Sequence, residues 1–387
     1  MENFKSEITV KSRIYLSLAH MGGSEQNFIK EAFDTNWVVP LGPNVDAFER
    51  ALSEYIGEGR FVVALSSGTA AIHLGLILSG VQAGDEVICQ SFTFAASANP
   101  IAYLGAKPVF IDSEMDTWNM DPVLLEEAIQ DRLHKTGRLP KAIIVVHLYG
   151  IPAKMDEIRK IADTYQIPVV EDAAEALGST LYGRKCGVFG EFGILSFNGN
   201  KIITTSGGGA LVCRTEEQAK RALFFATQAR DQAPHYEHSH IGYNYRMSNI
   251  CAGIGRGQML VLDARIARRR EIHRLYTDGL KAISGITVMQ SPTSCFDSNY
   301  WLTCILVDEK LAGKTREDLR LKMETNNIET RPLWKPMHLQ PVFANAPAYS
   351  NGTSKYLFDN GLCLPSGSIL TDDDIQRVVE VICTYKN

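Results

Sequence analysis

Short apolar runs separated by helical patterns dominate the chain between residues 61 and 213. The helical pattern after the first run covers residues 70–78. Runs that are apolar on both faces and separated by helices are typical of a parallel sheet covered on both sides. We therefore expect an α/β fold with a mainly parallel seven-stranded sheet flanked by helices. Its candidate strands are residues 61–65, 86–90, 107–112, 142–148, 167–172, 193–197 and 208–213.

A different pattern begins near the end of this region. Residues 258–280 are rich in Arg, Leu and Ala and predict a long helix leading out of the first domain. ITVMQ, YWLTCILV and an amphipathic helix from Asp372 then indicate a smaller α+β domain. We divide the chain into a large domain, 1–255, and a small domain, 256–387. The N-terminal segment is a candidate to pack on the small domain.

Composition narrows the range of partners. The 387 residues carry a net charge of −5 and no long basic run, so we do not expect a nucleic-acid partner. No window approaches 18 consecutive apolar residues, which argues against a membrane span. Residues 1–18 lack the apolar core of a signal peptide. The eight cysteines are scattered without a CxxC pair, which favours reduced thiols, no metal site and a cytoplasmic location.

The stretch LSSGTAAIHL, residues 65–74, predicts a turn from a strand into a helix. The free N–H groups and the dipole of a helix start attract anions. Gly68 would let a phosphate approach the backbone, and Thr69 could add a hydroxyl. A plain Ser/Thr helix cap explains this motif better when it is taken alone.

The stretch VVEDAAEALGS, residues 169–179, places carboxylates at the end of an apolar strand. Ligands bind at this end of the strands in open α/β sheets. A buried Asp172 would need a cationic partner, and a protonated ring nitrogen would serve. A salt bridge to a neighbouring Lys or Arg is an equal alternative on this motif alone.

A single lysine, Lys201, lies in the open loop between the last two candidate strands. A lysine in a polar loop is most often solvated. This one follows a buried strand, so we expect it at the same sheet edge, where a free amine could form a Schiff base. The glycines at 207–209 leave room for a planar ring, and Ser196 could donate to a phosphate.

These three motifs together specify one ligand. It has a phosphate, a protonated ring nitrogen and an aldehyde, which describes pyridoxal phosphate. The combination is far more specific than any one of its parts.

Segments spread along nearly the whole chain resemble the DegT/DnrJ/EryC1/StrS nucleotide-sugar aminotransferases. The resemblance implies PLP-dependent transferase fold type I, the fold of aspartate aminotransferase. The matching segments are NWVVPLGPNVDAFE, ALSSGTAAIHL, GDEVICQSFTFAASANPI, PVFIDSEMDTWNMDP, VVEDAAEALGS, SFNGNKIITTSGGGALV, IGYNYRMSNICAGIGRGQM, TRPLWKPMHLQPVF and LCLPSG.

The resemblance also implies a set of cofactor-binding residues. Lys201 would be the imine lysine and Asp172 the partner of the pyridinium, while Gly68, Thr69 and Ser196 would hold the phosphate. Phe92 would stack on the pyridine ring. Asn244 would reach the cofactor phosphate of a neighbouring subunit, which implies a homodimer with shared active sites. Glu175 occupies a position next to the ring hydroxyl where many members carry Gln or His. One branch of the family replaces the lysine by His and performs dehydration, so Lys201 argues against that chemistry.

The implied reaction is ping-pong transfer of an amino group from L-glutamate, which leaves as 2-oxoglutarate, to a nucleotide-linked keto sugar. Residues 36–49 and 330–343 look most like members that aminate C4 of UDP-linked 4-keto-6-deoxy-N-acetylhexosamines for surface glycans. Alternatives are C3 amination of a dTDP-3-keto-6-deoxy sugar, or a catalytically silent homologue that binds the cofactor. The residues expected on the sugar-nucleotide side are Arg331, Trp334, Lys335 and His338.

Three further signals remain. His235, His238 and His240 have a plausible metal spacing without supporting ligands, so we favour a mobile active-site loop over a metal site. GIGRG, residues 253–257, lies in a helical stretch and indicates close helix packing instead of a dinucleotide motif. Arg246 could bind phosphate or pair with an acid, and its proximity to Asn244 favours the active site.

Overall fold

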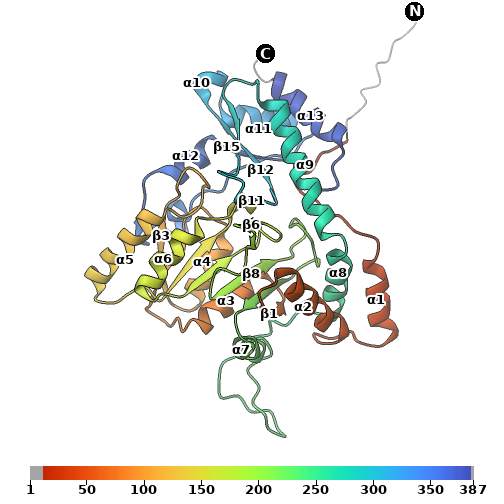
Figure 1. Ribbon diagram of the computed structural model, residues 1–387, viewed down its shortest axis with the longest axis vertical. Helices are drawn as coiled ribbons and strands as arrows, with labels where there is room; N and C mark the ends of the chain where they lie inside the picture. The colour runs from red at the N-terminus through yellow and green to blue at the C-terminus, as the bar shows by residue number, and fades with distance from the viewer. Residues whose placement is uncertain (1–11, 385–387) are drawn as a thin grey trace, which may run out of the picture.

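The computed structural model describes residues 12–384 and confirms an α/β fold built on a mainly parallel sheet (Figure 1). The strand order is β1-β9-β8-β5-β4-β2-β3-β14. β9 is antiparallel to β1 and β8, and the other neighbours are parallel. Seven strands match the predicted ones, and the short β14 comes from the C-terminal part of the chain. The strands are β1 Phe61–Leu65, β2 Glu86–Gln90, β3 Lys107–Ile111, β4 Ala142–Val146, β5 Val169–Asp172, β8 Phe192–Ser196, β9 Gly209–Cys213 and β14 Ala348–Tyr349.

Helices cover both faces of this sheet, because successive residues of each strand point to opposite sides. On β4, Ile143 and Val145 join the core beneath α2, α5 and α6, whereas Ile144 joins the core beneath α3, α4 and α7. The apolar runs without polar alternation therefore reflect burial on both faces. The helices are α2 Pro43–Ile56, α3 Gly68–Leu78, α4 Ala95–Tyr103, α5 Pro122–Thr136, α6 Met155–Tyr165 and α7 Glu216–Ala226.

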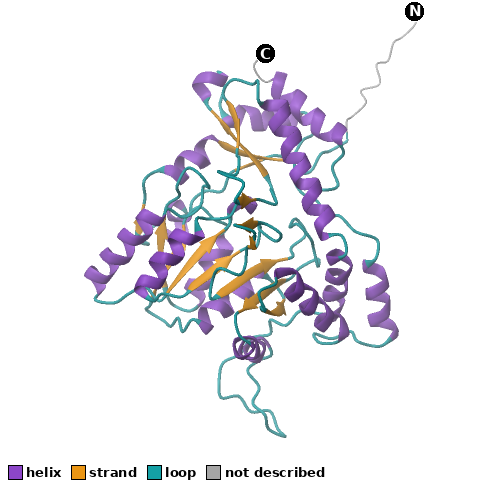
Figure 2. Cartoon of the chain, in the orientation of Figure 1, coloured by secondary structure: helices purple, strands orange, loops and turns teal. Residues whose placement is uncertain are grey.

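The C-terminal part builds a second, antiparallel sheet in the order β10-β12-β15-β13 with its own core (Figure 2). Ile14 belongs to this core and forms a bridge with Ile328, so the N-terminal segment lies against it. The elements are β10 Ile286–Val288, β12 Thr303–Val307, β13 Arg331–Pro332, β15 Gly361–Leu364, α9 Leu262–Leu280, α10 Glu309–Ala312, α11 Arg316–Thr325, α12 Thr353–Asn360 and α13 Asp372–Cys383.

The predicted helix over residues 258–280 is interrupted. α8 ends at Met259 and α9 begins at Leu262, so the predicted helix is mainly α9. The proposed division at 255/256 falls inside α8 (Asn249–Met259) and stays a prediction. GIGRG lies in α8 and packs closely, as predicted: a Cβ on Gly255 would lie 2.7 Å from the Phe48 ring. The remaining elements are α1 Glu25–Asp34, a small sheet of β11 Phe296–Asp297, β6 Thr180–Leu181 and β7 Arg184–Lys185, and 3-10 turns at Leu148–Gly150, Met337–Leu339 and Pro341–Phe343.

Residues 227–248 connect α7 to α8, and much of this segment projects from the body of the molecule as an arm (Figure 1). The arm carries the three histidines considered above, all exposed. Among residues 12–384, no helix is long and apolar enough to cross a membrane. Much of the segment examined for a signal peptide, residues 1–11, lies outside the described residues. The cytoplasmic location stays a prediction.

Candidate active site

A cavity of about 660 Å³ opens at the carboxyl ends of β1, β5 and β8. This is the edge at which open α/β sheets bind ligands. The N-terminal segment and the C-terminal part also contribute to its walls, through residues such as Ser17 and Trp301. Eight of the residues predicted from the sequence line this cavity: Gly68, Thr69, Asp172, Glu175, Ser196, Lys201, Arg331 and Trp334.

The start of α3 forms one wall. Ser67 caps the helix, because its side chain accepts a hydrogen bond from the N–H of Ala70 at 3.0 Å. The first N–H groups of a helix have no acceptor within the helix. Gly209 on β9 packs directly behind this turn, and a Cβ there would lie 2.3 Å from the nitrogen of Gly68. The helix start is therefore both a cap and an open anion cradle.

Asp172 ends β5 and is only 5% exposed. The hydroxyl of Ser97 donates to one carboxylate oxygen at 2.7 Å, and the N–H of Ala174 donates to the other at 3.1 Å. Burial raises the pKa of this carboxyl group. Among residues 12–384, Asp172 forms no ion pair with a basic side chain, so the predicted alternative of a salt bridge is not what the structure shows. The carboxylate of Asp172 is therefore free to pair with the protonated ring nitrogen of a ligand.

Lys201 points its amine at Glu175. The Nζ atom lies 3.3 Å from Oε1 of Glu175 and 4.2 Å from the ring centre of Trp301. The other carboxylate oxygen of Glu175 accepts the N–H of Tyr149 at 2.7 Å. Burial raises the pKa of Glu175 to about 7, although the charge of Lys201 opposes this shift. The amine of Lys201 therefore lies between an acid and an aromatic face, and its side chain is 14% exposed.

The loop that carries Lys201 is held by distant parts of the chain. The indole N–H of Trp301 and the hydroxyl of Ser17 donate to the carbonyl of Asn200, at 2.7 Å and 2.8 Å. The guanidinium of Arg269 donates to the carbonyl of Lys201 at 3.4 Å. Arg269 is 1% exposed, and burial lowers its pKa to about 9. The position of the lysine thus depends on both ends of the sequence.

Aromatic rings form another part of the cavity wall. The ring centre of Trp334 lies 5.5 Å from Phe94 and 5.2 Å from Tyr149. Phe94 lines the cavity and is 59% exposed. Phe92, in contrast, is fully buried in the core and meets Tyr149 edge to face at 6.4 Å. The prediction that Phe92 stacks on a cofactor ring is therefore wrong, because the chain turns between the two residues and presents Phe94 instead.

Arg246 lies outside the cavity. Its guanidinium pairs with the carboxylate of Glu49 and donates to the carbonyl of Ala64 at 3.1 Å. Of the two roles considered for this arginine, the structure shows the pairing with an acid. A role for Arg246 in binding the substrate stays a prediction.

The remaining predicted residues also lie away from the cavity lining. His338 lies 2.6 Å from the hydroxyl of Ser91, and Lys335 is exposed to solvent, so the structure does not support substrate roles for them. Asn244 is exposed in the segment between α7 and α8 and does not line the cavity of its own subunit. Its role across a dimer stays a prediction. His235 lies 3.3 Å from Glu237 in the same segment.

The sequence from residue 20 to residue 383 matches the model of the DegT/DnrJ/EryC1/StrS aminotransferase family. EpsN of Bacillus subtilis, named as a pyridoxal phosphate-dependent aminotransferase, is 52% identical over 374 residues, which cover 96% of this chain and 95% of EpsN. The GDP-perosamine synthase of Caulobacter vibrioides is 34% identical over 370 residues, with coverage of 96% and 97%. The solved PLP form of Spr1654 from Streptococcus pneumoniae, described as a sugar aminotransferase, has a TM-score of 0.88, 27% identity and coverage of 97% and 98%.

The chain belongs to the DegT/DnrJ/EryC1/StrS aminotransferase family. It is a pyridoxal phosphate-dependent sugar aminotransferase of nucleotide-sugar biosynthesis. The residues of the cavity fit this cofactor: the buried carboxylate of Asp172 has no ion pair among residues 12–384, the start of α3 offers N–H groups to a phosphate, and the amine of Lys201 lies in the same cavity.

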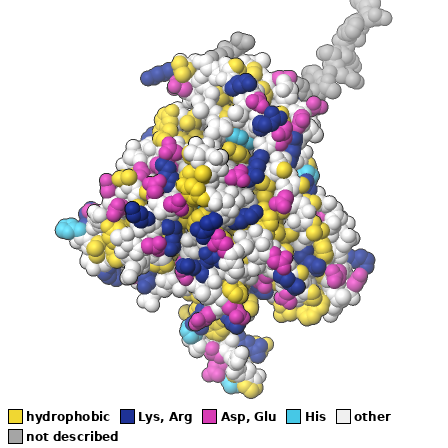
Figure 3. All heavy atoms as spheres, viewed as in Figure 1, with side chains coloured by type: hydrophobic (Ala, Val, Ile, Leu, Met, Phe, Trp, Pro, Cys, Tyr) yellow, Lys and Arg dark blue, Asp and Glu magenta, His cyan; other side chains and the backbone are white. Residues whose placement is uncertain are grey.

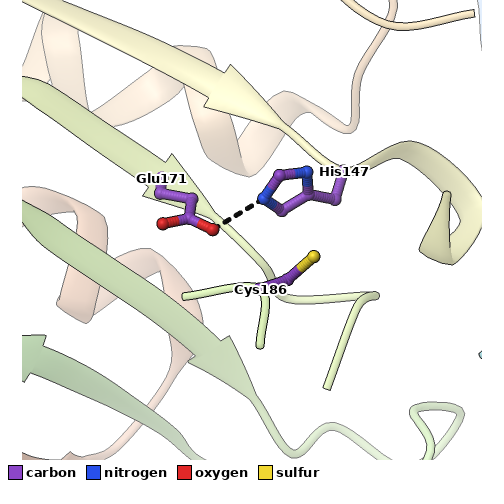
Figure 4. A group of neighbouring side chains, drawn as sticks. All are labelled: His147, Glu171 and Cys186. Atoms are coloured by element: carbon purple, nitrogen blue, oxygen red, sulfur yellow. Dashed lines mark hydrogen bonds and ion pairs between the residues drawn. The ribbon is translucent and has the colours of Figure 1, made fainter. Parts of the chain in front are cut away.

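Sequence reasoning missed a buried group of three side chains at β5 and directly after β4 and β7 (Figure 4). His147, Glu171 and Cys186 are fully buried, and their ligand-type atoms lie within 4.8 Å of one another. The Nε2 atom of His147 lies 2.7 Å from Glu171, and its Nδ1 atom accepts the N–H of Ala153 at 2.9 Å. Glu171 also accepts the N–H groups of Phe189 and Gly190. These hydrogen bonds stabilise the end of β5. The group is a poor metal site, because its nitrogen and oxygen atoms already have hydrogen-bond partners.

Proposed function

We propose that the enzyme transfers the amino group of L-glutamate to the C4 keto group of a UDP-linked 4-keto-6-deoxy sugar, UDP-2-acetamido-2,6-dideoxy-hexos-4-ulose. The product would enter amino-sugar and surface-glycan biosynthesis. The choice of C4 and of UDP rests on the resemblance of residues 36–49 and 330–343 to family members with that specificity. The amino-transfer chemistry rests on the cavity.

One observation carries the chemistry. The amine of Lys201 and the uncompensated carboxylate of Asp172 line the same cavity, together with the start of α3. When bound there, pyridoxal phosphate supplies a carbonyl that links to amines and a protonated ring that accepts electrons. Asp172 would hold the proton on the ring nitrogen. Its two hydrogen bonds, from Ser97 and Ala174, orient the carboxylate for that task and favour its ionised form against the effect of burial.

Lys201 would move the proton. Once free, its Nζ takes the proton from Cα of the amino donor and delivers a proton in the second half of the transfer. Glu175 lies 3.3 Å from this nitrogen and, with a pKa of about 7, can accept a hydrogen bond from the amine or donate one to a neighbouring oxygen. The indole ring of Trp301, whose centre lies 4.2 Å from this nitrogen, lies against the amine.

The sugar nucleotide would enter past the aromatic wall. Phe94 and Trp334 offer an apolar surface that suits the C6 methyl group of a 6-deoxy sugar. Arg331 lines the cavity, and its side chain is 68% exposed, so its guanidinium can meet a diphosphate at the rim. Its present partner is the half-buried Glu329, at 2.8 Å, and a diphosphate can compete with this carboxylate for the exposed guanidinium.

The site would be completed by a second copy of the chain. Asn244 lies in the segment between α7 and α8, where it forms a bridge with Thr227, and it is exposed and does not line the cavity of its own subunit. We propose a homodimer in which this amide reaches the partner's cofactor phosphate.

A panel of nucleotide keto sugars tests the proposed substrate. The purified holoenzyme is incubated with L-glutamate and UDP-, GDP- or dTDP-linked 3-keto and 4-keto sugars, and the products are analysed by mass spectrometry and NMR. We expect a C4 amine on the UDP-linked sugar. A C3 amine on the dTDP-linked sugar would overturn the assignment of position and nucleotide. Glutamate-loaded enzyme that no keto sugar discharges would instead indicate a silent homologue.

A further inference from the structure

A second cavity, of about 410 Å³, lies at the opposite edge of the large sheet. Arg60 immediately precedes β1, and Arg214 immediately follows the antiparallel β9, so both lie at the amino end of β1. Lys and Arg side chains gather over α6 and the neighbouring strands on the face shown in Figure 3. The basic residues that line this cavity are Arg60, Arg159, Lys160, Arg184 and Arg214.

Acidic residues neutralise three of these five charges. Arg159 pairs with Asp163 at 2.6 Å, Arg184 with Glu58 at 2.8 Å, and Arg214 with Glu191 at 3.1 Å. The other acid in the lining, Asp156, is exposed. Within residues 12–384, neither Arg60 nor Lys160 forms an ion pair.

Arg60 is the unusual member of the group. Its side chain is partly buried, and its guanidinium donates only to the carbonyl of Val188 among the described residues. Burial lowers its pKa, and the positive charge of Arg214 lowers it further, although the negative charges of Glu58 and Glu171 oppose these effects. Taking a charge partly out of water without a direct ion pair is costly, and a neighbouring like charge adds to the cost. A bound anion would remove both penalties.

We propose that this cavity binds the diphosphate group of a small anionic ligand, with Arg60 and Lys160 as its principal partners. A guanidinium matches two phosphate oxygens at once, and an ammonium adds a compact second charge. The cavity has the volume of a small-molecule site. Strands of five residues span about 17 Å, so this site is separate from the Lys201 cavity.

The diphosphate could belong to free pyrophosphate or to a nucleoside diphosphate. A polymeric nucleic acid fits the observations less well, because the chain is acidic overall and acids are interspersed around the cavity. The inference does not depend on the proposed sugar substrate, and a negative result would leave that proposal untouched.

Calorimetric titration of the holoenzyme at constant ionic strength tests the site. Sodium pyrophosphate is titrated into wild type, Arg60→Gln, Lys160→Gln and the control Arg138→Gln. Arg138 is 71% exposed on its side chain and lies outside the cavity, 4.0 Å from Asp85. We expect saturable binding to wild type, at least about tenfold weaker binding to Arg60→Gln, several-fold weaker binding to Lys160→Gln, and no change for the control.

Lys160→Gln keeps the test informative if Arg60→Gln does not fold, because the ammonium of Lys160 has no ion pair to lose. Unchanged affinity in both cavity variants, or the absence of saturable binding to wild type, would overturn the proposal. A second titration with UDP separates the two ligand sources. The decrease in UDP affinity caused by Arg60→Gln measures the binding of UDP at this cavity. If UDP binds there more strongly than pyrophosphate, the ligand is a nucleoside diphosphate. If the two affinities are equal, the ligand is free pyrophosphate.

Discussion

The hydroxyl of Ser97 donates a hydrogen bond of 2.7 Å to the carboxylate of Asp172. Ser97 lies in α4, whereas Asp172 ends β5, so a helix on one face of the sheet orients the acid at its edge. Thr93 extends this chain of hydrogen bonds, with its hydroxyl 2.7 Å from that of Ser97. In the proposed mechanism, Ser97 is a positioning residue that acts through Asp172.

Replacing Ser97 by Ala removes a hydrogen-bond donor that favours the ionised carboxylate of Asp172. The pKa of Asp172 should therefore rise, and its interaction with a protonated ring nitrogen should weaken. A hydrogen bond to a charged group contributes enough for an expected loss of about tenfold in kcat. The measurements are kcat against pH and the cofactor Kd. Ser79→Ala, which loses a hydrogen bond to the carbonyl of Gly75 at the end of α3, is the control. Equal kinetics for the two variants would contradict the positioning role.

Lys201→Ala removes the proposed nucleophile and proton carrier. We expect kcat to fall by at least about a thousandfold, while the protein keeps its fold and binds cofactor without a covalent link. Borohydride reduction followed by peptide mapping checks the assignment, with label expected at Lys201 in wild type. Lys107→Ala, at an exposed position, is the control. A covalent label on another lysine of the wild-type protein would refute this role.

The raised pKa of Glu175 predicts a pH dependence of stability. Burial raises this pKa to about 7 from an ordinary value of 4.5, so the folded protein retains a proton that the unfolded chain releases between these values. The cofactor-free protein should therefore lose stability as pH rises through this window, by about 3 kcal/mol in total. Melting temperatures of wild type and Glu175→Gln should converge at low pH and separate above pH 7, with the variant more stable. Parallel curves, as expected for the exposed control Glu127→Gln, would contradict the prediction.

Two basic residues close in sequence should behave differently. Arg331 lines the cavity, whereas Lys335 is exposed outside its lining. Arg331→Gln should raise KM for the sugar nucleotide about tenfold and leave the half-reaction with glutamate unchanged, because the lost interaction is with the diphosphate. Lys335→Gln should change neither. Steady-state kinetics for both substrates distinguish the outcomes, and an equal effect of both variants would place the diphosphate elsewhere.

Shared active sites predict complementation between two inactive variants. In a mixed dimer of Lys201→Ala and Asn244→Ala, one site regains an intact lysine from one subunit and an intact amide from the other. Random mixing should restore about a quarter of wild-type activity, since half of the dimers are mixed and each has one complete site. The assay follows activity after co-refolding. If the mixture stays inactive while mixed dimers form, Asn244 does not act across the interface.

The sequence predicted the sheet and the residues at its carboxyl edge because both depend on local signals. Lys201, Asp172 and Gly68 each follow a recognisable apolar strand, and the strand ends meet at one edge of a parallel sheet. The helix break at residues 260–261 had no such signal, since no Pro or Gly occupies it.

The differences from the sequence predictions arose where the chain turns or where tertiary partners decide. Phe92 and Phe94 are two residues apart in one short motif, and only the turn before α4 sends the first into the core and the second into the cavity. Arg246 pairs with Glu49, which is 197 residues away in sequence. Ser97 and Ser17 were missed because a serine in an apolar helix or near the N-terminus carries no local sign of its partner.

The hydrogen bonds from Trp301, Ser17 and Arg269 to the loop of Lys201 have a consequence for engineering. Exchanging the part of the chain from α9 onward with that of a relative, as a route to a new sugar preference, would also replace two of the three side chains that fix the reactive amine. Such chimeras should recover turnover only when positions 269 and 301 are carried over unchanged with their surroundings. Specificity and reactivity in this enzyme are therefore inherited together.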